Sequence, residues 1–168
     1  MAIEISTEGE AQMITDGVEA GRARRADLPR SEHGRWQPAA DRRDPVAILV
    51  IETGANDGLR GLNVDSLAAN IQAIIDRARQ QTPAPRIVLV GMRAPPNNGF
   101  GYARRFREVY PELAKRNHIA LVPFLLEGVA GTEGLNQADM IHPTAAGQRR
   151  VAETVWRVLE GELRGGER

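Results

Sequence analysis

The sequence predicts an α/β domain with a parallel sheet, and two observations lead to this expectation. From residue 46 onward, short apolar runs alternate with longer segments in which apolar residues recur at helical spacing. The apolar runs are continuous, which is typical of strands that are buried on both faces. Strands that alternate with helices along a chain form parallel sheets with helices packed against them.

Three apolar runs are the predicted strands. Residues 46–51 form the first, residues 87–90 the second and residues 119–126 the third. The polar and turn-forming residues between these runs separate them from the helical segments. The three runs are therefore expected to lie side by side in the interior of the domain.

The segments between and after these runs are the predicted helices. Residues 65–80 form the first helix, which Asp65 or Ser66 is well placed to cap. Residues 102–117 form the second, and a third follows His142. The apolar residues on one face of each helix are Leu67, Ile71, Ile74 and Ile75, then Phe106, Val109, Tyr110 and Leu113, then Val151, Val155, Val158 and Leu159.

The first 45 residues differ from the rest of the chain. Residues 2–6 alternate in the manner of a short strand, but residues 21–44 are rich in Arg and Pro and have little apolar periodicity. We therefore predict an atypical, partly linker-like segment at 1–45, an α/β domain at 46–163 and a tail at 164–168. The 168 residues are enough for one domain with a substantial core.

Composition argues against several classes of function. The formal net charge is +0, so no overall field favours nucleic acid or an anionic membrane as a partner. No apolar run approaches the roughly 20 residues of a membrane span. No signal peptide pattern is found, so the chain as it stands is expected in the cytoplasm. The chain has no Cys, which excludes disulfides, thiolate nucleophiles and Cys-based metal sites.

Polar residues follow each predicted strand. Residues 54–61 come after the first strand, residues 93–99 after the second, and Asp139 and His142 after the third. Ligands bind beyond the carboxyl ends of the strands in open parallel sheets, so these segments are expected to converge. An Asp three residues before a His can hold one ring nitrogen and leave the other free as a base. An Asn such as Asn56 can direct its amide at a developing oxyanion.

Each of these features also has a purely structural interpretation. Asn56, Asp57 and the Gly that follows them form a strong turn signal. Asp139 can cap a helix beside a surface His142. Their combination, their order and their place in the topology favour a functional site.

Several stretches resemble one family of hydrolases. Gly54-Ala-Asn-Asp57 resembles the third conserved block of the SGNH (GDSL) hydrolases, and Asp139-Met-Ile-His142 resembles the fifth. The longer stretch Gly-Ala-Asn-Asp-Gly-Leu-Arg-Gly is similar to the bacterial arylesterase, thioesterase I and lysophospholipase group. Further similar stretches are residues 92–99, 109–115 and 121–124, and the resemblance covers residues 46–160.

The resemblance implies a three-layer, flavodoxin-like fold and a carboxylic-ester hydrolase. In such an enzyme His142 is the general base and Asp139 orients it. Asn56 and Gly54 form the oxyanion hole, Gly54 by permitting a tight backbone, and residues 93–102 line the substrate pocket. The implied substrates are short acyl or aryl esters, with thioesters and lysophospholipids as alternatives, cleaved through an acyl-enzyme without metal or cofactor. Members of this family are often exported.

The block that carries the family's nucleophile is missing. The family opens with a strand that ends in Gly-Asp-Ser-Leu, and this chain has three serines in all, at positions 6, 31 and 66. Val64-Asp-Ser-Leu67 is similar to that block but follows the third block, so we interpret Ser66 as part of a helix cap. Ser6 is a candidate nucleophile if residues 2–6 replace the family's first strand. Ser31 is a candidate because it lies close to the second-block position.

The missing block leaves other interpretations open. His142 could activate water directly, which is a slower route. The chain could instead be a catalytically inactive, truncated remnant that binds acyl ligands or self-associates.

The missing first strand also has a consequence for assembly. In the family's sheet this strand lies beside residues 46–51, so its loss would expose an apolar strand edge. Either residues 2–6 pair there, or two chains pair edge to edge in a symmetric dimer. We therefore expect a homo-oligomer formed through an exposed strand edge.

Overall fold

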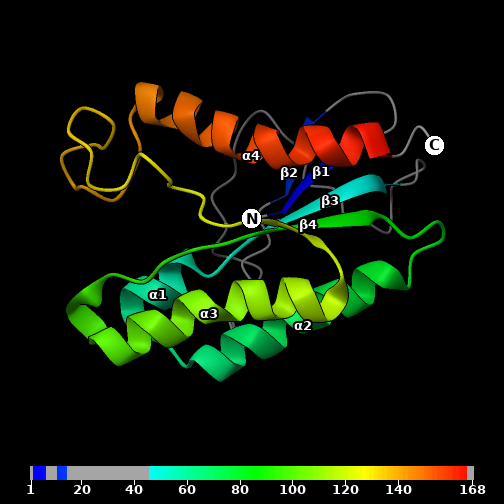
Figure 1. The fold of residues 1–168 in the computed structure, drawn as a ribbon, viewed down its shortest axis with the longest axis horizontal. Helices are drawn as coiled ribbons and strands as arrows, with labels where there is room; N and C mark the ends of the chain where they lie inside the picture. The colour runs from blue at the N-terminus through cyan, green and yellow to red at the C-terminus, as the bar shows by residue number, and fades with distance from the viewer. Residues whose placement is uncertain (1, 7–10, 15–45, 166–168) are drawn as a thin grey trace, which may run out of the picture.

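The computed structural model describes residues 2–6, 11–14 and 46–165 (Figure 1). Its five-stranded sheet has the order β2-β1-β3-β4-β5. The strands are β1 (Ala2–Ser6), β2 (Ala11–Ile14), β3 (Val46–Glu52), β4 (Arg86–Val90) and β5 (Ala120–Val122). The helices are α1 (Ala55–Arg60), α2 (Val64–Arg79), α3 (Phe100–Asn117) and α4 (Ala145–Gly165), and the 3₁₀ helix η2 (Pro96–Asn98) precedes α3.

The predicted fold class is confirmed, because β3, β4 and β5 pair in parallel and helices cover both faces of the sheet. α4 lies on one face, and α1, α2 and α3 lie on the other (Figure 1). Successive side chains of β3 and β4 enter two separate apolar cores, so consecutive inner positions of these strands have to be apolar. The buried strand residues are Leu49, Ile51, Ile87 and Leu89 in the core with α2 and α3, and Ile48, Val50, Val88 and Val90 in the core with α4.

β5 is shorter than the apolar run at 119–126 that we predicted as a strand. Pro123 follows its last residue and has no N–H to continue the ladder. The chain turns at this point, and the backbone N–H of Leu125 donates to the carbonyl of Gly91 at 2.9 Å. Phe124 is nevertheless buried. Apolar residues after the Pro therefore pack into the core from a turn and not from a strand.

Helix boundaries also differ from the prediction. α2 begins at Val64, and its N-cap is Asn63, whose side chain accepts a hydrogen bond from the Ser66 N–H at 2.9 Å. The prediction that Asp65 or Ser66 caps this helix is wrong, because the cap side chain has to reach an N–H three residues further along. α4 extends to Gly165, into the predicted tail. None of the described helices is long and apolar enough to cross a membrane.

β1 occupies the place beside β3 and runs antiparallel to it. Ala2 lies opposite Ile51, and Ser6 lies opposite Val46. Of the two predicted ways to cover the β3 edge, pairing with this segment is confirmed. The antiparallel direction places Ser6 at the amino end of β3, roughly 20 Å along the strand from its carboxyl end at about 3.3 Å per residue.

Removing β1 and β2 should open the β3 edge. We expect a chain that starts at residue 45 to associate through this edge, because unpaired apolar strands recruit other strands. Light scattering should show larger particles than the full chain gives at the same concentration. A truncated chain that stays monodisperse and as soluble as the full chain would contradict this role for β1. Self-association of the full chain stays a prediction, and the same measurement on the full chain tests it.

Candidate active site

The segments that follow β3, β4 and β5 lie beyond the same edge of the sheet (Figure 1). The chain enters α1 after β3 and reaches η2 after β4. After β5 it forms the segment that carries Asp139 and His142 and leads to α4. Parallel pairing of the strands is sufficient to bring these three segments to one edge.

Asn56 lies in the first turn of α1, so the turn signal that it forms with Asp57 and Gly58 lies within a short helix. Gly54 precedes this helix with φ 99°, in the left-handed region that side chains rarely adopt. A Cβ at this position would also overlap with Tyr110 Oη. Two physical constraints therefore require Gly54, and the Asn56 side chain that follows it is exposed.

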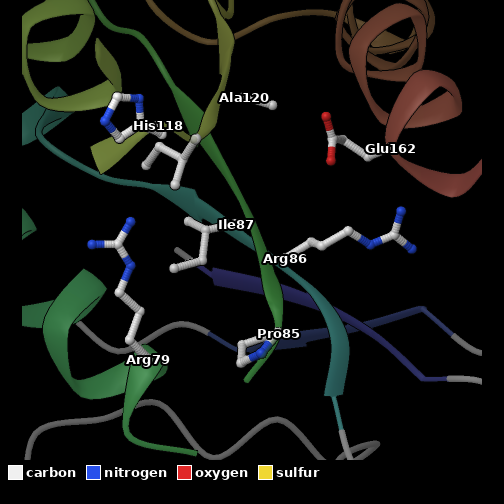
Figure 2. Close-up of a pocket in the computed structure, with 8 residues that line it drawn as sticks. Arg79, Pro85, Arg86, Ile87, His118, Ala120 and Glu162 are labelled. Atoms are coloured by element: carbon white, nitrogen blue, oxygen red, sulfur yellow. The ribbon is translucent and has the colours of Figure 1, made fainter. Parts of the chain in front are cut away.

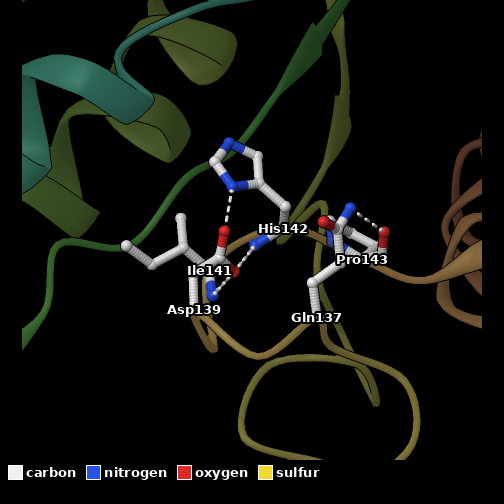
Figure 3. A network of polar contacts seen from close by, with 5 residues as sticks. All are labelled: Gln137, Asp139, Ile141, His142 and Pro143. Carbon is white, nitrogen blue, oxygen red and sulfur yellow. Dashed lines mark hydrogen bonds and ion pairs between the residues drawn. The ribbon is translucent and has the colours of Figure 1, made fainter.

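Asp139 and His142 contact each other directly (Figure 3). His142 Nδ1 lies 2.7 Å from Asp139 Oδ2. The other carboxylate oxygen, Oδ1, accepts hydrogen bonds from the backbone N–H groups of Ile141 at 2.9 Å and His142 at 3.0 Å. No described residue hydrogen-bonds to His142 Nε2, and this side chain is 70% exposed. The ring is therefore held through one nitrogen and open at the other.

The same contacts keep Asp139 ionised. They lower the pKa of Asp139 from 3.8 to about 2, with the His142 backbone N–H as the largest cause, followed by the His142 ring and the Ile141 backbone N–H. A carboxylate with this pKa is charged throughout the neutral pH range and stabilises a protonated imidazole beside it. The pair therefore combines a charged carboxylate at Nδ1 of His142 with an accessible Nε2.

Two amide side chains hold the segment that carries His142, and sequence analysis missed both. The backbone N–H of Gln137 donates to the His142 carbonyl at 2.7 Å, and its side chain donates to the Pro143 carbonyl at 3.2 Å (Figure 3). The buried Asn136 forms an isolated β-bridge with Pro143, and its side chain donates to the Val129 carbonyl at 2.7 Å. Hydrogen bonds of this kind, between residues five to seven positions apart in a non-helical segment, leave no periodic signal in a sequence.

The segment after β4 contacts both neighbouring segments at this edge of the sheet. The Arg93 guanidinium lies 4.2 Å from the centre of the Phe124 ring, and it contacts Glu127 at 3.5 Å. It thus ties this segment to the one after β5. Phe100 is 85% exposed, and the Tyr102 hydroxyl donates to backbone carbonyls in and just after α1. That residues 93–102 line a substrate pocket stays a prediction.

The structure separates the three candidate serines. Ser6 lies at the amino end of β3, away from the edge where Asp139 and His142 lie, so the prediction that it takes the nucleophile's place is contradicted by the strand register. Ser66 is exposed in the first turn of α2. Ser31 lies outside the described residues.

A cavity of about 250 Å³ lies at the opposite edge of the sheet, where β4 and β5 begin (Figure 2). Its ionisable lining residues are Arg79, Arg86, His118 and Glu162. It is therefore separate from the Asp139–His142 pair. Across the described residues, no group of three or more His, Asp or Glu side chains could hold a metal ion.

The pKa of Asp139 provides a direct test of this geometry. An NMR titration of its carboxyl group should show a midpoint of about 2, and His142→Ala should raise the midpoint while leaving it below 3.8. The rise stays partial because the two backbone N–H groups persist. Because the folded-state pKa is lowered, the contact stabilises the folded chain above about pH 4 and is lost as the pH falls through the folded-state value. A wild-type midpoint at 3.8 would contradict the contact.

The relatives found by comparison with known proteins agree with one another. Residues 12–150 match the sequence model of the GDSL-like Lipase/Acylhydrolase family. The chain is 42% identical over 123 residues to Esterase TesA of Pseudomonas aeruginosa, a match that covers 73% of this chain and 60% of that protein. It is 35% identical over 116 residues to an arylesterase of Vibrio mimicus, covering 69% of this chain and 57% of that protein.

A crystal structure of TesA superposes on this fold with a TM-score of 0.62 at 43% sequence identity, covering 67% of this chain and 62% of that chain. The chain spans about three fifths of the length of the relatives that it matches. The family match includes both the segment with Asn56 and the segment with Asp139 and His142. The chain belongs to the GDSL-like lipase/acylhydrolase family.

Proposed function

We propose that this chain is a carboxylic-ester hydrolase that acts on short acyl or aryl esters. The Asp139–His142 pair is the observation on which the proposal rests. Oδ1 of Asp139 accepts two backbone hydrogen bonds and Oδ2 contacts His142 Nδ1, while no described residue hydrogen-bonds to His142 Nε2. Relatives named as an esterase and an arylesterase support the choice of substrate class. The resemblance to thioesterase I and lysophospholipases extends the range to be tested to thioesters and lysophospholipids.

The proposed reaction uses three side chains of this chain. His142 Nε2 removes the proton from an attacking O–H group while Asp139 stabilises the imidazolium. The oxygen attacks the ester carbonyl carbon, and negative charge develops on the carbonyl oxygen. The Asn56 side-chain amide donates a hydrogen bond to that oxygen. Collapse of the intermediate expels the alcohol, which takes the proton from His142.

Two groups remain as candidates for the attacking O–H group. Ser31 would form an acyl-enzyme that water then hydrolyses, as the family resemblance implies. A water molecule activated by His142 would give the products without an acyl-enzyme and at a lower rate. The two routes differ in whether a covalent intermediate forms, so a covalent probe separates them.

Substitutions in the pair should remove the activity. We expect His142→Ala and Asp139→Ala each to abolish most turnover of p-nitrophenyl acetate, since the described part of the chain holds no second His–Asp contact. Asn56→Ala should lower turnover by about 10²–10³, the usual loss for one oxyanion donor. His118→Asn is the matched control, because this exposed His lies at the opposite edge of the sheet and Asn tolerates its φ of 51°. Unchanged turnover in His142→Ala would refute the proposal.

A fluorophosphonate probe should identify the nucleophile. Such probes label a serine that has both an activating base and an oxyanion hole. We expect labelling of Ser31 that disappears in His142→Ala, and no labelling of Ser66. Turnover that depends on His142 without any labelling would assign the attack to water. Label on Ser6 would contradict the register of β1, and neither label nor turnover would identify an inactive chain.

A further inference from the structure

α3 presents three aromatic rings to the segment that carries Asn56. Tyr102, Phe106 and Tyr110 are spaced four residues apart, and their ring centres are 6.0 Å and 5.8 Å apart. Residues four apart lie on one face of a helix. α1 lies beside α3 on the same face of the sheet (Figure 1). The three rings therefore form one continuous support for α1.

Tyr110 contacts the start of α1. Its side chain is fully buried, and its Oη donates to the Thr53 carbonyl at 3.0 Å. The same oxygen occupies the space that a Cβ of Gly54 would need. Burial raises the pKa of the Tyr110 phenol, and the nearby carboxylates of Asp57 and Glu52 raise it further. The hydroxyl therefore keeps its proton and remains a donor.

The other two rings contact the rest of α1. Tyr102 Oη lies 3.1 Å from the Asp57 carbonyl oxygen and 2.9 Å from that of Leu62. Phe106 packs so closely on Gly58 that a Cβ there would come within 3.0 Å of the ring. α1 has only six residues, and helices shorter than about 12–15 residues are marginal on their own. Its orientation must therefore come from contacts of this kind.

We propose that Tyr110 is a positioning residue for the oxyanion donor. Its hydroxyl holds the Thr53 carbonyl in place and thereby sets the direction of the backbone after β3 and the position of Asn56. This inference rests on the proposed function for the role of Asn56. Thr53 is three residues before Asn56 and joins the rigid strand β3 to α1. A small rotation of the backbone at Thr53 would move the Asn56 amide away from the developing oxyanion, to which such donors must be aligned closely.

Tyr110→Phe tests the proposal, because it deletes the hydroxyl and keeps the buried ring. We expect kcat for p-nitrophenyl acetate to fall about tenfold with KM nearly unchanged, the pattern of an interaction made only in the transition state. In the Asn56→Ala background the same substitution should change kcat less than about twofold, because the two residues act together. An equal loss in both backgrounds, or no loss, would overturn the proposal.

Thr154→Val is the matched control for losing a buried hydroxyl. Thr154 is buried on α4, on the other face of the sheet, and its Oγ1 donates to the Arg150 carbonyl at 3.1 Å. This variant should lower the melting temperature without a specific loss of kcat. A kcat loss in Thr154→Val equal to that in Tyr110→Phe would mean that general destabilisation explains both, and would overturn the positioning role.

Amide hydrogen exchange separates this inference from the proposed function. The Gly58 N–H donates to the Gly54 carbonyl at 2.9 Å in the first turn of α1, and the Leu67 N–H donates to the Asn63 carbonyl at 3.2 Å in the first turn of α2. Tyr110→Phe should accelerate exchange at Gly58 at least about tenfold and leave Leu67 unchanged, because local opening affects only its own segment. If the wild type shows no His142-dependent turnover, the proposed function fails, and unchanged exchange at Gly58 would separately refute the role of Tyr110.

Discussion

The parallel pairing of β3, β4 and β5 is the constraint on which the rest of the structure depends. Parallel strands expose their carboxyl ends at the same edge, so the segments after the three strands must meet there. The same pairing requires helices on both faces, and α2, α3 and α4 supply the apolar side chains that cover the sheet. Residues about 80 positions apart in the chain, such as Asn56 and Asp139, are thereby brought to one edge.

The polar groups at this edge are held in two different ways. Asp139 and His142 belong to one short segment whose own hydrogen bonds determine its shape, with Gln137 as the outer support. Asn56 lies on a helix too short to be stable alone, and it depends on the aromatic face of α3. The proposed base is thus preorganised locally, whereas the proposed oxyanion donor is preorganised by packing against a separate helix.

β1 differs in direction from the strand that the family resemblance implies at its position. It fills the place beside β3 that the resemblance reserves for the strand with the nucleophile, but it runs in the opposite direction. The sheet gains a covered edge, while Ser6 is placed at the end of β3 remote from Asp139 and His142. Covering an apolar edge requires only backbone pairing, whereas placing a nucleophile requires the correct strand direction as well.

The sequence by itself determined the order of β3, α2, β4, α3, β5 and α4 and the Asp139–His142 pair, because these depend on periodicity and on contacts within a few residues. Helix α2 and the buried runs of β3 and β4 were predicted closely for this reason. The end of β5 before Pro123 is also a local signal, since Pro has no N–H to continue the ladder. The need for Gly54 followed from the family resemblance, and part of its cause is the tertiary contact with Tyr110 Oη. Only the tertiary structure decided the direction of β1 and the hydrogen bond from Tyr110 to the Thr53 carbonyl. Backbone N–H and C=O groups pair in either strand direction, and a tyrosine hydroxyl bonds whichever carbonyl the fold presents, so neither choice is encoded in a local pattern.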